Sequence, residues 1–323
     1  MMKILITGGK GYLGSAIAKN LQEGHRERTI IIGSHSSKEA LFENPKNFTY
    51  RQFSFSNQES LLTLCEKVDV ILHLAALDET QTELNPENAL HVNSLGTFNL
   101  LEAAKLKGVK KFFYFSTAHV YGSPLEGYLT EEAIPRPVSH YALTHKFAED
   151  YVLSNNYKTL NPKVTVFRLS NGIGAPGNLN NERWTLVVND LCNQAITKKE
   201  MLLKSSGKQY RDFVTLADIN KVIAYFIEAE PSSKITGLFN VGSGVSMQIC
   251  EIAALIQERC KDNFNFTPEL IIPKTQSAED FKPLNYSIQK LINLGIKPEN
   301  NFKKAIDETL FFCNKVVKKE YAY

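Results

Sequence analysis

A glycine-rich loop near the start of the chain constrains its fold more than any other feature. Residues 7–14 read Thr-Gly-Gly-Lys-Gly-Tyr-Leu-Gly, directly after an apolar run at residues 3–7 and before a helical pattern at about 12–22. Glycines at these spacings permit a tight turn and a close approach of the backbone to a pyrophosphate, which the N-terminus of the next helix stabilises. In this context the loop predicts a dinucleotide site, and an ordinary glycine turn is the alternative.

Apolar runs of strand length alternate with helical patterns through the first half of the chain. After the first run, they lie at residues 29–32, 48–55, 68–75, 111–115 and 164–169. The helical patterns between them lie at about residues 58–67, 88–107 and 140–156. Continuous apolar strands separated by helices predict an α/β fold, with a doubly wound, Rossmann-like parallel sheet covered on both faces.

Charge and cysteine content argue against several classes of protein. Lys plus Arg number 37 and Asp plus Glu 34, so the net charge of +3 gives no sign of a nucleic-acid or membrane-surface protein. No apolar run approaches the roughly 20 residues that span a bilayer, and no secretory signal precedes the first strand. Five scattered cysteines predict a reduced, cytoplasmic protein, and no cysteine or histidine spacing predicts a metal site.

The end of the second predicted strand bears on the choice of dinucleotide. A carboxylate usually bonds the 2′-hydroxyl of the adenine ribose there. This chain instead continues with Gly33, Ser34, His35, Ser36, Ser37 and Lys38. Hydroxyl, imidazole and ammonium groups suit a 2′-phosphate, whose charge a carboxylate would repel. We therefore expect NADP(H) in slight preference to NAD(H), and the alternative is a polar loop that lacks the ribose contact.

Several later segments resemble the signatures of one enzyme family. They lie at residues 73–76 (His-Leu-Ala-Ala), 93–104, 116–122 (Ser-Thr-Ala-His-Val-Tyr-Gly), 168–174, 209–213 and 294–298. Together with the glycine loop, they resemble the extended short-chain dehydrogenases/reductases, the group that includes the NAD(P)-dependent sugar-nucleotide epimerases and dehydratases. The resemblance runs from Lys3 to about Pro298, and such an ordered set of matches is more specific than any single motif.

The resemblance implies the catalytic residues. In the family, a tyrosine exchanges a proton with the substrate hydroxyl while hydride moves to or from nicotinamide, and a serine or threonine hydrogen-bonds the same oxygen. Tyr141 and Thr117 stand at these positions, with Ser116 as the second choice. A phenol with a pKa near 10 is a poor base at neutral pH unless a cation stabilises the phenolate. In the family that cation is a lysine four residues after the tyrosine, which also holds the nicotinamide ribose.

This chain departs from the family pattern at that lysine. His145 stands four residues after Tyr141, and Lys146 comes one position later. Since residues i and i+4 share a helix face while i+5 is rotated by about 100° more, we expect His145 to occupy the place of the lysine. A protonated His145 would supply positive charge, and a neutral one would donate to the ribose hydroxyls. The alternative for His145 is a helix-surface residue without a role.

The resemblance also implies the residues that contact the dinucleotide. They are Gly8, Gly11, Tyr12, Leu13, Gly14, Ser34, His35, Ser36, Lys38, Ser54, Phe55, Leu74, Ala75, Ala76, Asn93, Tyr141 and His145. Ser54 stands where the family usually has an acid near the adenine amino group. Its hydroxyl would make a weaker hydrogen bond than a carboxylate makes.

A second set of residues would contact the substrate. It comprises Thr117, His119, Asn171, Arg183 and Arg211. The guanidinium fork of arginine suits a diphosphate, and the alternative for Arg211 is a surface pair with Asp212 or Asp218. In a strand His119 would share the face of Thr117, although a packed core histidine is equally open. His73 is interpreted as a structural hydrogen-bonding residue.

Three functions follow from these observations, in decreasing order of expectation. The first is an epimerase or ketoreductase that acts on a nucleotide-diphosphate sugar, with the epimerase slightly preferred and the reductase favoured if NADP is the cofactor. Dehydration at C4 and C6 is disfavoured, because Ala118 and His119 stand where the family's 4,6-dehydratases usually have Asp and Glu. The second is a catalytically impaired dinucleotide-binding or redox-sensing protein. The third, binding of RNA or protein, is least expected given the balanced charge.

The predicted organisation has two parts. We expect a dinucleotide-binding domain at residues 1–170, completed by about 213–243, and a smaller C-terminal substrate-binding lobe at 171–212 and 244–323. The resemblance further implies a homodimer, in which the helices at about 88–107 and 140–156 pair with their copies.

Overall fold

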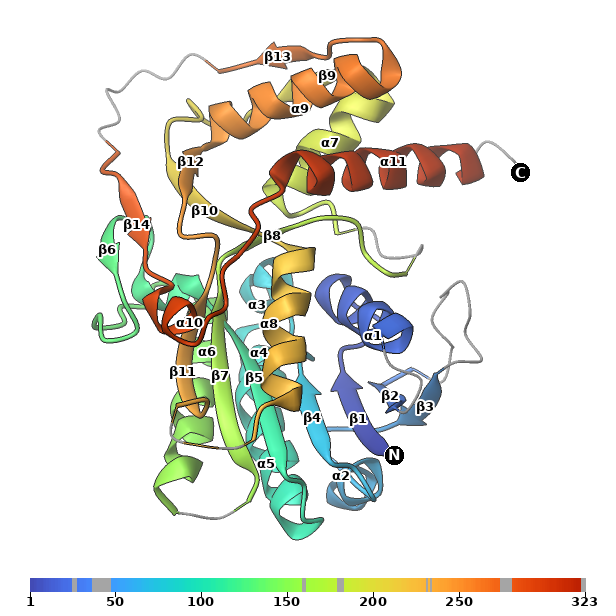
Figure 1. The fold of residues 1–323 in the computed structure, drawn as a ribbon, viewed down its shortest axis with the longest axis vertical. Coiled ribbons are helices and arrows are strands. Elements are labelled where there is room, and N and C mark those ends of the chain that lie inside the picture. Colours follow the sequence, from blue (N-terminus) through green and yellow to red (C-terminus); the bar gives the residue numbers. More distant parts are fainter. Residues whose placement is uncertain are drawn as a thin grey trace.

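A seven-stranded parallel sheet forms the centre of the computed structural model (Figure 1). Its strands are β1 (Met2–Thr7), β2 (Arg28–Ser34), β3 (Thr49–Gln52), β4 (Val70–His73), β5 (Lys111–Thr117), β7 (Lys163–Leu169) and β11 (Gly237–Val241). They follow the order β11-β7-β5-β4-β1-β2-β3, so the chain starts inside the sheet and winds outward in both directions. The predicted doubly wound α/β fold is confirmed, and β11 is an additional strand that the apolar patterns did not indicate.

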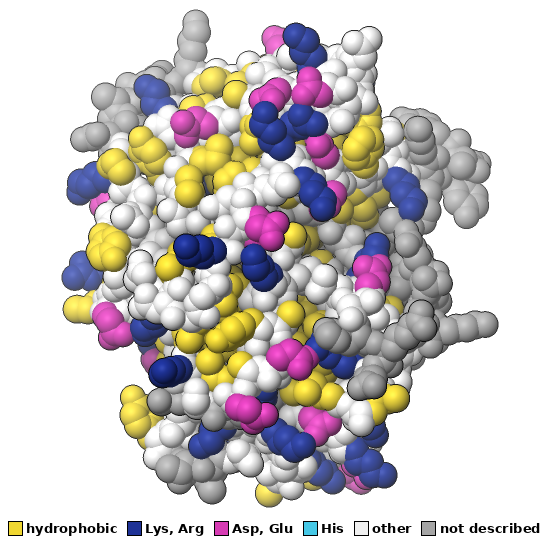
Figure 2. Space-filling view, viewed as in Figure 1, with side chains coloured by type: hydrophobic (Ala, Val, Ile, Leu, Met, Phe, Trp, Pro, Cys, Tyr) yellow, Lys and Arg dark blue, Asp and Glu magenta, His cyan; other side chains and the backbone are white. Residues whose placement is uncertain are grey.

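The structure describes residues 1–24, 28–36, 48–158, 161–178, 183–230, 232, 234–273 and 281–320. Within these ranges, no helix has both the length and the apolar character needed to cross a membrane. Figure 2 shows one face of the molecule, on which basic and acidic side chains are interspersed rather than gathered by sign.

Helices cover both faces of the sheet because alternate residues of its strands point to opposite sides. Ile4 and Ile6 of β1 pack in the apolar core beneath α1 (Tyr12–Gly24) and α8 (Leu216–Glu228). Leu5 packs in the opposite core, beneath α2 (Gln58–Leu64), α5 (Gly96–Leu106) and α6 (His140–Ser154). All three β1 side chains are fully buried, which explains why the strands are apolar runs without alternation.

The segment between β4 and α5 is helical but irregular. It contains α3 (Glu79–Leu84), α4 (Pro86–Ala89) and a π-helical stretch, η2 (Leu90–Leu95), that continues directly into α5. Asp78 caps α3 with its side chain, and Asn85 caps α4. The predicted helix at 88–107 is therefore present, with its first half wound as a π-helix that packs against α6.

The C-terminal part of the chain builds a smaller lobe above the carboxyl edge of the sheet (Figure 1). Its apolar core lies between α7 (Val187–Lys198), α9 (Ile249–Phe264) and α11 (Phe302–Glu320). Short strands complete it: β9 (Glu200–Leu202) pairs with β13 (Glu269–Ile271), and β10 (Tyr210–Thr215) pairs with β8 (Asn171–Ile173) and β12 (Ser246–Gln248). A further pair, β6 (Gly127–Leu129) and β14 (Leu284–Tyr286), lies beside α10 (Gln289–Asn293).

Candidate active site

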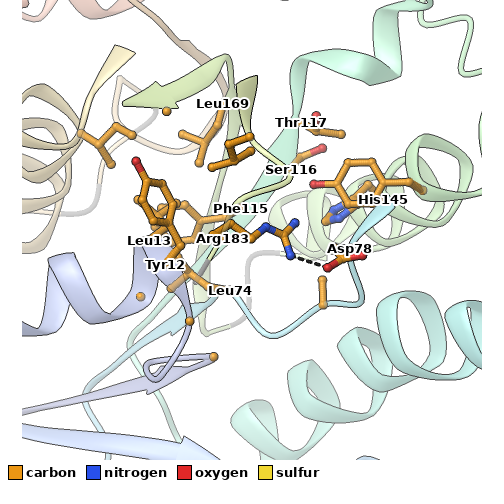
Figure 3. Close-up of a pocket in the computed structure, with 18 of the residues that line it drawn as sticks. Tyr12, Leu13, Leu74, Asp78, Phe115, Ser116, Thr117, His145, Leu169 and Arg183 are labelled. Atoms are coloured by element: carbon orange, nitrogen blue, oxygen red, sulfur yellow. Dashed lines mark hydrogen bonds and ion pairs between the residues drawn. The ribbon is translucent and has the colours of Figure 1, made fainter. Parts of the chain in front are cut away.

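Two adjoining hollows lie at the carboxyl edge of the central sheet, where ligands bind in folds of this type. The first, here called the main cleft, has a volume of about 300 Å³ and lies between the glycine loop, β5, the start of α6 and the segment that leads to the C-terminal lobe (Figure 3). The second, the side cleft, has a volume of about 440 Å³ and lies between the glycine loop and the end of β2. Gly8, Ala76 and Leu77 line both hollows, so together they form one elongated site.

The glycine loop leaves no room for side chains at two positions. A Cβ on Gly14 would lie 2.3 Å from the carbonyl oxygen of Gly8. Gly8 has a φ of +72°, and a Cβ there would lie 2.8 Å from the backbone of Leu74 and Ala75. The loop therefore packs directly against the segment after β4, and the N-terminus of α1 opens at the main cleft. The tight turn predicted from the spacing of the glycines is present.

The end of β2 lines the side cleft with polar groups. Ser34 Oγ accepts a hydrogen bond from the backbone N–H of Ser36 at 3.1 Å. Lys10 Nζ donates to the carbonyl oxygen of Ser36, also at 3.1 Å. Lys10 was not among the predicted residues, although its place between two glycines of the loop was visible in the sequence. Lys38 was among the predicted residues, but it lies outside the described residues.

Aromatic side chains form the floor of the side cleft. His35 packs against Phe53 and Phe55, with ring centroids 4.6 and 5.2 Å apart. Burial lowers the pKa of His35 below its usual value, so its ring is better suited to stacking than to carrying charge. Ser54 does not line either cleft; its hydroxyl lies 3.0 Å from that of Ser56.

Tyr141 and Thr117 come together in the main cleft from α6 and from the end of β5. Ser139 caps α6 by accepting the N–H of Ala142, which fixes the first turn where Tyr141 stands. Both side chains line the main cleft, and the Thr117 hydroxyl is close enough to Tyr141 to partly oppose the rise in the Tyr141 pKa that burial causes. Ser116 lies beside them but donates to Glu149 Oε2 at 3.0 Å. Ser116 is thus engaged with Glu149, while Thr117, the first choice from the sequence, faces the same cleft as the phenol.

His145 lies one helical turn after Tyr141 and also lines the main cleft. Its Nδ1 is 2.8 Å from the hydroxyl of Tyr114, a buried residue of β5. Burial, and secondarily the charge of His119, lower the pKa of His145 to about 4, so the imidazole is neutral at neutral pH. Of the two roles left open by the sequence, the neutral hydrogen-bond donor is the one compatible with this environment.

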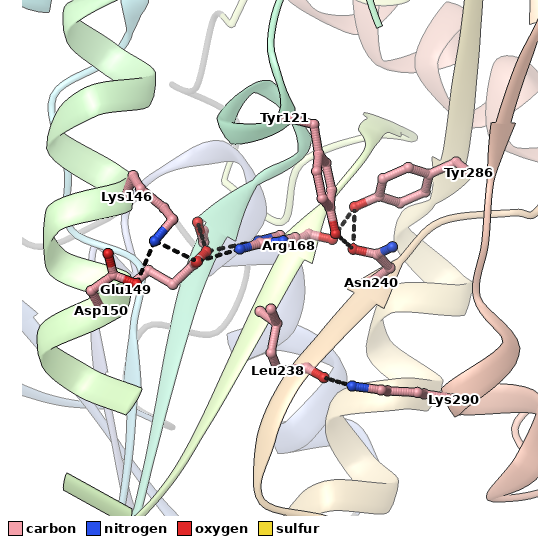
Figure 4. Close-up of polar contacts among 10 residues, drawn as sticks. Tyr121, Lys146, Glu149, Asp150, Arg168, Leu238, Asn240, Tyr286 and Lys290 are labelled. Atoms are coloured by element: carbon pink, nitrogen blue, oxygen red, sulfur yellow. Dashed lines mark hydrogen bonds and ion pairs between the residues drawn. The ribbon is translucent and has the colours of Figure 1, made fainter. Parts of the chain in front are cut away.

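Lys146 points away from the phenol, as the helical rotation predicts. It forms ion pairs with Asp150 and, at 3.8 Å, with Glu149 (Figure 4). Glu149 in turn accepts hydrogen bonds from the guanidinium of Arg168, which lies 4.5 Å from the ring centre of Tyr121. The lysine therefore belongs to a network behind the site and supplies no charge at the phenol.

Several charged side chains lie close to Tyr141. Arg183 lines the main cleft and forms an ion pair with Asp78 across it (Figure 3). Burial raises the pKa of Tyr141 above its usual range, Glu79 adds to this effect, and Arg183 opposes it. Asp78 and Glu79 were not among the predicted residues; in the sequence they look like an ordinary helix start.

The other predicted substrate residues, His119, Asn171 and Arg211, do not line the main cleft, although His119 and Arg211 lie near Glu79. His119 stands in a short 3₁₀ helix, η3 (Ala118–Tyr121), rather than in a strand, so the argument that it shares a strand face with Thr117 is wrong. Its Nε2 is 3.6 Å from Glu79 Oε1. Arg211 Nη1 donates to the carbonyl oxygen of Tyr210 at 3.0 Å. Burial lowers the pKa of Arg211, and the negative charge of Glu79 partly opposes this effect.

The aspartates proposed as alternative partners of Arg211 are engaged elsewhere. Asp212 accepts from the backbone N–H and the hydroxyl of Ser243, and Asp218 accepts from Thr215 and from the backbone of Glu299. No ion pair of either with Arg211 occurs among the described residues. Asn171 Nδ2 donates to the carbonyl oxygen of Asp212 at 2.9 Å.

Two predicted residues support the site from behind. Asn93 Oδ1 accepts from the N–H of Leu77 at 2.7 Å and its Nδ2 donates to Thr144 Oγ1, which ties the loop after β4 to α6. His73 lies between the hydroxyls of Thr7 and Thr97, at 2.7 and 2.8 Å, which confirms it as a structural hydrogen-bonding residue.

Comparison with known proteins adds independent findings. A model described as the NAD dependent epimerase/dehydratase family matches residues 4–242. The dTDP-D-glucose 4,6-dehydratase of Mus musculus is 26% identical over 330 residues, which cover 97% of this chain and 89% of the relative. A putative UDP-glucose 4-epimerase of Methanocaldococcus jannaschii is 26% identical over 306 residues, covering 94% and 95%. The UDP-glucose 4-epimerase of Thermus thermophilus, solved in complex with NAD, has a TM-score of 0.79 at 24% identity and covers 97% of this chain and 99% of that one.

Proposed function

The chain belongs to the NAD-dependent epimerase/dehydratase family, and we propose that it is an enzyme that oxidises or reduces a carbinol or ketone of a nucleotide-diphosphate sugar. The observation that carries the proposal is the arrangement of the main cleft. One wall is the glycine loop and the other is the Tyr141–Thr117 pair. A dinucleotide held on the first wall would present its reactive end to the second.

The residues of the site fit a nicotinamide dinucleotide. Gly8 and Gly14 leave bare backbone where a side chain would obstruct a pyrophosphate. The buried Nε2 of His145 has no hydrogen-bond partner among the described residues, and a ribose hydroxyl would satisfy it. When bound, the nicotinamide would accept or supply the hydride.

Tyr141 would exchange the proton in this chemistry, and Thr117 would hydrogen-bond the same substrate oxygen. Burial and the nearby Glu79 keep the phenol protonated, and the neutral His145 provides no cation beside it. A protonated phenol is ready to donate to the oxygen of a ketone that is being reduced. Ketoreduction is therefore our first proposal for the reaction, although the sequence alone slightly favoured epimerisation, which stays the second.

We further propose a preference for NADP(H). Lys10, Ser34 and Ser36 gather at the end of β2, and no carboxylate lines the side cleft within the described residues. An ammonium group and two hydroxyls favour a 2′-phosphate over a 2′-hydroxyl. Lys10 joins the residues expected there from the sequence, of which Lys38 lies outside the described residues.

The substrate would lie on the side of Arg183. This guanidinium already pairs with a carboxylate of Asp78 at the mouth of the cleft, and a diphosphate offers the same kind of acceptor with more charge. Arg211 and Asn171 extend the polar surface from β10 and β8. Accordingly, we propose residues 1–170 with about 213–243 as the dinucleotide-binding domain, and residues 171–212 and 244–323 as the substrate-binding lobe.

A homodimer is proposed from the apolar surface of η2 and α6, which contact each other. Leu90, Leu95, Leu143 and Phe147 expose between 45% and 57% of their surface there. In water, such a row of apolar side chains on two adjacent helices favours burial against a second copy.

A single assay tests the proposed reaction and distinguishes this enzyme from the second candidate. That candidate is a protein that binds the dinucleotide but is inactive because it lacks the family's lysine. Purified protein is incubated with NADPH or NAD+ and a panel of nucleotide-diphosphate sugars and their 4-keto forms. We expect conversion of at least one compound and a loss of about 10²- to 10⁴-fold in Tyr141→Phe. Tyr128→Phe, which alters an exposed tyrosine of β6, is the matched control. Dinucleotide binding without conversion of any compound would favour the second candidate.

A further inference from the structure

The imidazole of His145 is held on one side only. Nδ1 lies 2.8 Å from the Tyr114 hydroxyl, while Nε2 is buried without a partner among the described residues. The ring is 3% exposed and packs against Tyr114 and, edge to face, against Tyr141. The polar atom that His145 can still offer to a ligand in the main cleft is therefore Nε2.

The hydrogen bond to Tyr114 can form in two directions with unequal cost. If Tyr114 donates to Nδ1, the proton of the neutral imidazole resides on Nε2, and one buried donor awaits a partner. If Nδ1–H donates to Tyr114, the phenol proton and the Nε2 lone pair are both left unsatisfied, because the Tyr114 hydroxyl has no second partner among the described residues. Because each buried unsatisfied group destabilises the fold, the first arrangement, which leaves one such group instead of two, is favoured.

We propose that Tyr114 is a positioning residue that fixes His145 in the tautomer with its proton on Nε2, and that this N–H holds the nicotinamide ribose as a neutral donor. The claim that this N–H binds the ribose rests on the proposed function, whereas the claim about the tautomer does not. Tyr114 lines neither cleft and would act through His145 alone. In this chain an uncharged clamp, built from β5 and α6, thus replaces the charged lysine of the family pattern.

The tautomer can be read in the free protein by nuclear magnetic resonance. In a ¹⁵N-labelled sample at neutral pH, long-range proton–nitrogen correlations distinguish a protonated Nε2 from a protonated Nδ1, and the His145→Gln variant assigns the signals. We expect a single Nε2–H tautomer in the unaltered protein and a mixture of both in Tyr114→Phe. Tyr157→Phe, which alters a tyrosine that is 91% exposed, should leave the spectrum unchanged.

The effect on binding is tested by a double-mutant cycle, with NADPH affinity measured by calorimetry. Tyr114→Phe should weaken binding by roughly three- to tenfold, the value of one hydrogen bond, and His145→Ala should weaken it at least as much. In the His145→Ala background, Tyr114→Phe should have no further effect, because its action passes through the imidazole. An equal loss in both backgrounds would show a merely structural role.

The two proposals fail in different ways. If the free protein shows the Nδ1–H tautomer, or a mixture that Tyr114→Phe does not change, the inference about Tyr114 is overturned even when NADPH binds. If the tautomer is fixed as expected but neither NADPH nor NADH binds, the proposed function fails, and the ribose part of the inference fails with it.

Discussion

The ring of Tyr141 meets the imidazole of His145 at 64°, with 4.5 Å between the ring centres, one turn apart on α6. This is the place in which the family pattern has a tyrosine beside a lysine. Here the neighbour of the phenol is a buried, neutral ring. With Tyr141 in the proposed role of proton donor, the absence of a cation at position 145 would disfavour the phenolate, and this is why we propose reduction of a ketone rather than oxidation of an alcohol.

Lys10 is predicted to decide between the two dinucleotides. In Lys10→Ala, the affinity for NADPH should fall by about tenfold, as expected for the loss of a charge-assisted hydrogen bond, while the affinity for NADH changes less than twofold. Calorimetric titration measures both. Lys204→Ala, an exposed lysine of the C-terminal lobe, serves as the control. Equal losses for the two dinucleotides would remove Lys10 from the 2′-phosphate site.

Glu149 is predicted to stabilise the protein through Arg168. Both side chains are buried, and Glu149→Gln would leave a guanidinium without its counter-charge. Removal of one partner of a buried ion pair typically costs about 3–5 kcal/mol, so denaturant unfolding should show a loss of that size. Asp150→Asn, one residue later on the exposed face of α6, should cost less than about 1 kcal/mol. Similar losses in both variants would contradict this account of the network.

Burial of His145 predicts a specific dependence of the stability of the protein on pH. The pKa of His145 is about 4 in the folded protein and near 6.5 in an unfolded chain. Between these values the unfolded state binds more protons, so stability falls as the pH falls from 6.5 to 4. The total loss due to His145 is on the order of 3 kcal/mol. Urea unfolding at pH 7 and pH 5 should show a smaller decrease in His145→Gln than in the unaltered protein; equal decreases would mean that His145 titrates normally.

The apolar surface of η2 and α6 is predicted to be the dimer interface. Phe147→Glu places a charge in the middle of that surface and should convert a dimer into a monomer, as measured by light scattering after size exclusion. Leu202→Glu, at a half-exposed leucine of the C-terminal lobe, should leave the mass unchanged. If the unaltered protein is monomeric at micromolar concentration, the dimer proposal is wrong.

Local patterns made most of the fold predictable. Five strands of the central sheet are runs of apolar residues bounded by turns, and the glycine loop marks its own position between β1 and α1. The edge strand β3 (Thr49–Gln52) is polar and not buried, and it lies within the broader run predicted at 48–55. β11 was missed because Gly237–Val241 is short and begins with glycine, so it carries little strand signal. His119 was misplaced for a related reason, since a chain leaving a buried strand gives no sequence sign of turning at once into a 3₁₀ helix.

The polar partners of the site could not be predicted because they depend on distant parts of the chain. Arg183 and Asp78 are 105 residues apart in the sequence and meet only across the cleft. The role of Tyr114 depends on its facing the one helix position where histidine replaces lysine. By contrast, the rotation of Lys146 away from the phenol follows from helix geometry alone and was predicted.

The central claim is that the glycine loop binds a nicotinamide dinucleotide, and calorimetric titration with NADPH and NADH tests it most directly. Gly14→Val is the variant that should block binding, because its side chain would collide with the backbone of Gly8. The account predicts saturable binding of NADPH, weaker binding of NADH, and the loss of both in a Gly14→Val variant that remains folded by circular dichroism. The absence of heat with either dinucleotide, or unchanged binding in a folded Gly14→Val protein, would contradict it.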